Sequence, residues 1–116
     1  MSSYSIRILI LATLMTATSI SSAAEAQAMD VSKCKKALIQ AKKLDMLYDV
    51  RAERIPIGIL VGPTWFKVPI DAKEGFSAVV ACVLGDGKNL CTPFDLLDYR
   101  TAKPVARWRM CKLQME

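Results

Sequence analysis

Polar and apolar residues follow the order of an export signal at the start of the chain. A short polar segment with one cation precedes the apolar run "ILILATLMTATSI" at 8–20, and small residues follow it. Ala26 and Ala28 have the spacing of a signal-peptidase site, and the run is shorter than the about 20 residues of a membrane-spanning helix. The pattern predicts a cleavable secretory signal peptide at 1–28, rather than a membrane anchor. The mature form then begins near Met29 and does not span a membrane.

After the signal, apolar side chains recur every three or four residues. Residues 29–54 contain no Gly or Pro, so the spacing predicts one helix over 29–54 that Asp30 or Ser32 caps. Lysines crowd the first half of this helix and acidic residues the second half, which is the reverse of the order that the helix dipole favours. A charge order that opposes the helix dipole without an evident structural gain makes this segment a candidate for a functional role.

The middle of the chain changes from strand-like to helical spacing. Residues 55–70 are rich in β-branched and aromatic side chains and are interrupted by a Gly-Pro pair, which predicts a strand, a turn and a second short strand. Residues 71–87 predict a helix with one apolar face and a terminal glycine. A capping box between Asp71 and Glu74 is expected to start it.

Apolar and polar side chains alternate at 94–110 and predict a β-hairpin. We expect Leu96 to pair with Trp108 and Asp95 with Arg109, because this register makes one face apolar and places opposite charges on the other. Trp108 then belongs to the core, and the arginines on either side of it face water.

These elements define an α+β fold. Their order, α-β-β-α-β-β, predicts a small two-layer domain over 29–116, with two helices packed on one face of a four-stranded, mostly antiparallel sheet. The pattern does not determine the order of the strands.

Cysteines change this picture by adding covalent links. Four of them follow the signal, and an even number in a short exported chain predicts two disulfides and a periplasmic or secreted location. Short connections favour Cys82–Cys91 with Cys34–Cys111, and Cys34–Cys82 with Cys91–Cys111 is the rival pairing. A zinc site is disfavoured, because the chain has no C-x-x-C spacing and no histidine.

Charge adds a candidate surface. The chain has 16 Lys+Arg against 11 Asp+Glu, and the net charge of +5 is unchanged without the signal, which holds one of each. A basic exported protein is attracted to anionic surfaces, although such charges often only solvate a protein. Nucleic acid is a disfavoured partner, because no aromatic side chain is placed beside the lysines for base stacking. The candidate anion-binding residues are Lys33, Lys35, Lys36, Lys42, Lys43, Arg107 and Arg109.

Catalytic chemistry has little support in this sequence. Without histidine there is no His general base and no Ser-His-Asp site, and no glycine-rich loop could hold a phosphate. Lys73 and Ser77 are four residues apart on the second helix, but nothing supplies an oxyanion site for them. We therefore expect no catalytic residues, no cofactor and no metal.

Two functional hypotheses follow. The first is an exported, disulfide-stabilised, non-enzymatic binding or accessory protein whose partner is an envelope or extracellular protein. The alternative is a basic binder of an anionic polymer or membrane surface, through the lysines of the first helix.

Overall fold

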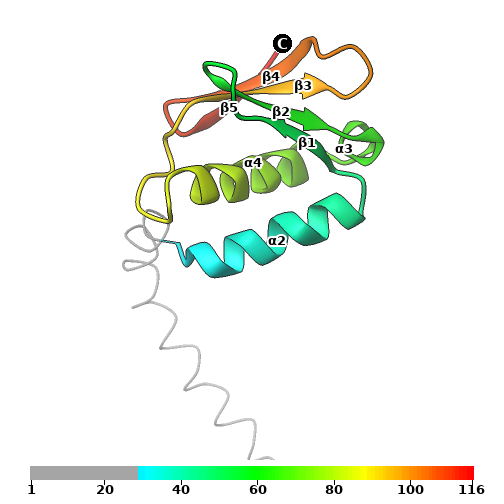
Figure 1. The fold of residues 1–116 in the computed structure, drawn as a ribbon. Helices are drawn as coiled ribbons and strands as arrows, with labels where there is room; N and C mark the ends of the chain where they lie inside the picture. Colours follow the sequence, from blue (N-terminus) through cyan, green and yellow to red (C-terminus); the bar gives the residue numbers. More distant parts are fainter. Residues whose placement is uncertain (1–28) are drawn as a thin grey trace, which may run out of the picture.

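The computed structural model describes residues 29–116, so the predicted signal peptide at 1–28 lies outside the described residues. Within 29–116 the chain forms one five-stranded sheet and three helices (Figure 1). The elements in chain order are α2 (Val31–Lys43), β1 (Leu47–Arg51), β2 (Ile57–Val61), α3 (Pro63–Lys67), α4 (Ile70–Leu84), β3 (Phe94–Asp98), β4 (Pro104–Arg109) and β5 (Lys112–Met115).

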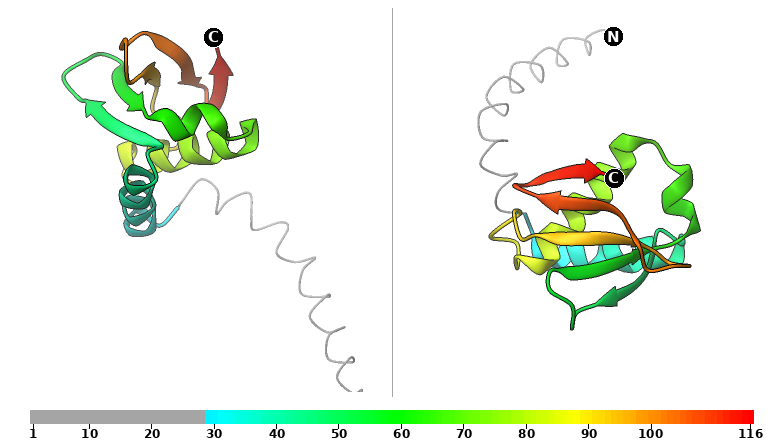
Figure 2. Two further views of the ribbon diagram at one scale, coloured as in Figure 1. Left: turned by 90° about the vertical axis from the view of Figure 1, so that its right-hand side faces the viewer. Right: turned by 90° about the horizontal axis from the view of Figure 1, so that it is seen from above.

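The sheet keeps the strands in chain order, β1-β2-β3-β4-β5. Strands β2 and β3 are parallel because α3 and α4 cross over between them, and the other neighbours are antiparallel. Helix α4 lies under the sheet, and α2 packs against α4 and β1 on the same side (Figures 1 and 2). The α+β class is therefore confirmed, but the four-stranded, mostly antiparallel sheet matches only roughly.

The core lies between the sheet and α4. Phe94 and Leu96 of β3 point into it and are fully buried. Trp108 is 5% exposed, its ring stacks on Phe94 at 5.9 Å, and its Nε1 donates to the Leu90 carbonyl at 2.8 Å. Trp108 is thus a core residue, as the alternation predicts.

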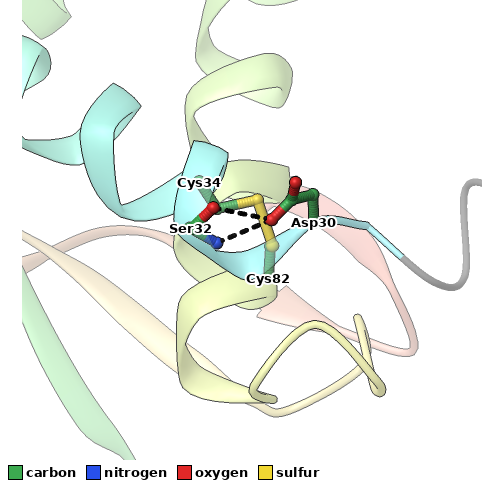
Figure 3. Close-up of a disulfide and its surroundings, with 4 residues drawn as sticks. All are labelled: Asp30, Ser32, Cys34 and Cys82. Atoms are coloured by element: carbon green, nitrogen blue, oxygen red, sulfur yellow. Dashed lines mark hydrogen bonds between the residues drawn. A yellow bond between two sulfur atoms is a disulfide. The ribbon is translucent and has the colours of Figure 1, made fainter.

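The predicted helix over 29–54 is wrong in its second half. Helix α2 begins where Asp30 accepts hydrogen bonds from the backbone N–H and hydroxyl of Ser32, and it ends at Lys43 (Figure 3). Asp45 then takes a left-handed φ of 61°, and 47–51 pair with β2 as a strand. The acidic residues therefore lie beyond the helix, and Lys42 and Lys43 occupy its last turn, where the dipole favours cations.

The second strand expected in 55–70 is also wrong. Gly62 begins α3, and Pro63 occupies the first helical turn, where its missing N–H and fixed φ are favourable. The short helix carries Trp65 into the core, where it is 1% exposed. Tertiary burial of one large aromatic side chain has overridden the strand propensity of its neighbours.

Helix α4 confirms the helix predicted at 71–87 but not its capping box. The helix starts at Ile70 with Pro69 at the cap position, and no side chain caps it. Asp71 consequently lies inside the first turn rather than at the cap. Gly85 forms the C-cap, as predicted.

The C-terminal hairpin has the predicted faces in a different register. Phe94 pairs with Trp108 and Asp95 with Arg107, a slip of two residues that keeps Phe94, Leu96 and Trp108 on the core face. A fifth strand, β5, was not predicted. A two-residue turn with left-handed φ at Met110 and Cys111 leads into it, and non-glycine residues rarely take this conformation.

The disulfides are Cys34–Cys82 (Figure 3) and Cys91–Cys111. The favoured pairing of Cys82 with Cys91 and Cys34 with Cys111 is wrong, and the rival pairing is correct. Helices α2 and α4 are antiparallel, so Cys34 near the start of α2 lies beside Cys82 near the end of α4, with their Cα atoms 6.3 Å apart.

Candidate functional site

The predicted anion-binding residues do not form one surface. All the lysines of α2 are exposed on the helical side of the domain. Arg107 and Arg109 flank the inward-facing Trp108, so they point to the opposite side of the sheet. The structure therefore separates the helix lysines from the strand arginines.

Arg109 belongs to an ion-pair network on the helix-free face of the sheet. Its Nη2 lies 2.7 Å from Asp95, the pair expected from the sequence, and Arg54 binds the other carboxylate oxygen at 2.8 Å. Both guanidinium groups also donate to backbone carbonyls, Arg54 to Pro56 and Arg109 to Phe94. The network holds the β1–β2 loop against the sheet.

Asp95 stays ionised in this network. Burial alone would raise the pKa of Asp95, but the hydrogen bonds and charges of Arg54 and Arg109 outweigh burial and hold that pKa below its ordinary value. Gly58, its neighbour on β2, makes the geometry possible. A Cβ at Gly58 would meet Leu97 at 2.7 Å and the Arg54 side chain at 3.1 Å.

A second cluster gathers at the end of the sheet where the parallel strands β2 and β3 finish. The rings of Tyr48 and Tyr99 are 5.5 Å apart, and the Arg100 guanidinium lies 5.4 Å from the Tyr99 ring and 5.7 Å from the Phe66 ring. These four residues are the aromatic–arginine patch. Tyr48 is 53% exposed and Phe66 is 38% exposed, so the patch faces solvent.

Separate elements position this patch. Tyr48 comes from β1, Phe66 from α3, and Tyr99 with Arg100 from the turn after β3. Asp98 fixes Arg100 by accepting from its backbone N–H at 2.8 Å and from its guanidinium at 3.0 Å. Both hydrogen bonds lower the pKa of Asp98, and the bond from the Arg100 side chain has the larger effect. A hollow of 240 Å³ adjoins the patch.

Sequence reasoning missed this patch. Tyr99 and Arg100 directly follow the alternating segment that begins at Phe94, which was an available signal. Tyr48 was assigned to a helix and Phe66 to a strand, so their approach to Tyr99 could not be predicted. Exposed aromatic rings beside arginine can bind a planar or acidic group on a partner by stacking and charge.

The remaining candidate groups are occupied in local contacts. Ser77 donates its hydroxyl to the Lys73 carbonyl at 2.8 Å, and Lys73 donates to the Val68 carbonyl at 2.9 Å. Over residues 29–116, no cluster of three or more His, Cys, Asp or Glu side chains is arranged to hold a metal ion. Over the same residues, no helix has the length and apolar character needed to cross a bilayer.

Comparisons of the chain with protein-family models, with curated proteins and with solved structures find no match.

Proposed function

We propose that this chain is an exported, disulfide-stabilised, non-enzymatic protein that binds an envelope or extracellular protein through the aromatic–arginine patch. The observation that carries the proposal is the convergence of exposed Tyr48 and Phe66 with Tyr99 and Arg100 from separate elements. Tyrosine and arginine are over-represented among the residues that dominate binding energy in protein interfaces.

The physical argument concerns rigid side chains. Tyr99 and Phe66 flank the Arg100 guanidinium, which Asp98 holds, so a partner would immobilise few additional side-chain rotations. Lys67 also lines the adjoining hollow. Together with the net charge of +5, this composition supports a partner surface with carboxylate groups.

Binding is tested by capture of envelope proteins on the immobilised chain. We expect a partner that the wild type retains and that both Phe66→Ala and Arg100→Ala lose. Ile39→Ala is the matched control, because Ile39 is an exposed apolar side chain on α2, outside the patch. A partner retained equally by all four proteins would contradict the role of the patch.

Export is tested by the intact mass of the protein from the exported fraction of its host, before and after reduction and alkylation. We expect a chain that begins near Met29 and has no reactive thiol until it is reduced. A chain of 116 residues with free thiols would contradict both export and the disulfides.

A second candidate function is binding to an anionic polymer or membrane surface. One observation favours it: α2 carries its lysines exposed and has no acidic residue within the helix. Such binding would weaken steeply with salt.

A further inference from the structure

An open apolar groove runs between the C-terminal half of α2 and the N-terminal half of α4. Its volume is 380 Å³. At the other end of this helix pair, Cys34–Cys82 fixes the two helices together. The groove is lined chiefly by Leu38, Ala41, Leu44, Gly75, Phe76 and Val79.

Two features of the groove are not explained by packing within the chain. Leu44 is 56% exposed on its α2 wall. On the α4 wall, Gly75 occupies the interior of a helix, where glycine is destabilising, yet a Cβ there would have no atom within 4 Å. Packing within the chain requires neither the exposed side chain of Leu44 nor the missing side chain of Gly75. Both features fit an element that contacts the groove from outside.

The two rims of the groove carry opposite charges. Gln40 lines the groove, and Lys43 is one turn further along the same side of α2. On α4, Asp71 is one turn before Gly75 on the same side of the helix. Lys43 and Asp71 are both exposed, and neither forms an ion pair with any residue in 29–116.

The disulfide sets which residues of the antiparallel helices lie at the same level. Because Cys34 is level with Cys82, Lys43 lies nine residues along α2 at the level of residue 73, within one turn of Asp71. The basic rim and the acidic rim therefore stand at the same height on the two sides of one groove.

From this arrangement we infer that a second copy of this chain docks on the groove. A two-fold axis parallel to the groove places α2 of each copy over α4 of the other, so Lys43 of each copy faces Asp71 of the other copy. A two-fold axis perpendicular to the groove would instead place each rim against the rim of the same charge in the other copy, which is repulsive. This interface is separate from the aromatic–arginine patch and does not depend on the proposed function.

The test is the dimer dissociation constant of the chain as its host processes it, with both disulfides formed, measured by sedimentation from micromolar to millimolar concentration. We expect a monomer–dimer equilibrium in the wild type. Lys43→Glu should weaken the dimer by on the order of tenfold, since two attractive contacts become repulsive. Lys42→Glu is the matched control, because the adjacent lysine lies on another side of α2.

The decisive variant combines Lys43→Glu with Asp71→Lys. It exchanges the charges of the rims and should restore most of the lost affinity, because the symmetry brings each exchanged rim against the other. Circular dichroism establishes that each variant is folded. A wild type that stays monomeric up to millimolar concentration overturns the inference. Equal weakening by Lys42→Glu and Lys43→Glu, or no rescue by the exchange, overturns this interface.

Discussion

Asp95 shows how one residue can connect distant parts of this small domain. Its side chain is only 11% exposed, and its carboxylate accepts hydrogen bonds from Arg54 of the β1–β2 loop and from Arg109 of β4. Because Gly58 has no side chain, the Arg54 side chain has room to lie against the sheet. The ion pair with Asp95 and the absent side chain at Gly58 together hold the β1–β2 loop in place.

The same carboxylate gives a pH-dependent prediction. The folded pKa of Asp95 is depressed below 3.8, so its stabilising contribution is complete above that pH and is lost as the pH falls through the lower folded value. Asp95→Asn should cost about 1–2 kcal/mol at neutral pH. This is less than the about 3–5 kcal/mol of a fully buried pair, because both arginines are about a third exposed.

Urea unfolding of the wild type and Asp95→Asn between pH 7 and pH 2 measures this contribution. The difference between the two free energies of unfolding should be constant at neutral pH and shrink in acid. Because Asp98 and Asp30 have lowered pKa values in both proteins, they cancel from the difference. A difference that does not vary with pH would assign the loss to packing instead of charge.

Two glycines should respond to alanine in opposite directions. Gly75→Ala places a methyl group in open space within a helix, so it should stabilise the monomer by about 0.5–1 kcal/mol through helix propensity. Gly58→Ala forces a Cβ to 2.7 Å from Leu97 and should destabilise by about 1–3 kcal/mol. Thermal unfolding at low micromolar concentration compares them, and a stabilising Gly58→Ala would contradict the packing described for Arg54.

At the scale of elements, the residue pattern predicted those helices and strands whose structure depends on interactions between residues close together in the chain. The helical spacing of α4 and the alternation of β3 and β4 predicted their type and the side chains that face the core. The Asp95–Arg109 ion pair also forms, although Asp95 lies opposite Arg107 in the observed register. The strand β1 was not predictable in this way. Its residues fit a helical pattern, and they become a strand only by pairing with β2.

The aromatic–arginine patch depends on the same tertiary information. Tyr48 lies close to Tyr99 because β1 and β3 both flank β2 in the sheet. Which strands are neighbours in the sheet does not follow from the pattern of residues. The Cys34–Cys82 disulfide had the same requirement, since it depends on the antiparallel placement of α2 and α4. Only the rival pairing contained the two observed disulfides.

The disulfides join different kinds of elements and should differ in reactivity. Cys34 and Cys82 are 3% and 0% exposed between two helices, whereas Cys91 and Cys111 lie on exposed loops. A thiolate reductant needs access to sulfur, so mild reduction should open Cys91–Cys111 first. Alkylation followed by peptide mass analysis over time measures the order. Simultaneous appearance of all four thiols would mean that reduction requires global unfolding.

At the scale of the whole molecule, charge is divided between two layers. Helix α2, which carries the lysines, lies on one side of the sheet (Figure 2). The network of Arg54, Asp95 and Arg109 lies on the other side. A flat anionic surface can therefore contact only one of these sets at a time. We therefore expect the basic face of a single layer, rather than the net charge of +5, to decide whether the chain binds such a surface.

This division makes the second candidate function directly testable. If α2 binds anionic vesicles, Lys35→Gln with Lys42→Gln should weaken binding by about thirtyfold at low salt, at about 1 kcal/mol for each lysine lost near the surface. Lys103→Gln with Lys112→Gln removes the same charge from the sheet layer and should change little. Vesicle sedimentation at low and moderate salt measures all three proteins, and duplex DNA serves as a second anionic probe.

Equal weakening by both double variants would mean that net charge alone drives the attraction. No binding of the wild type at low salt would exclude the anionic surface as its partner and leave the protein partner as the candidate.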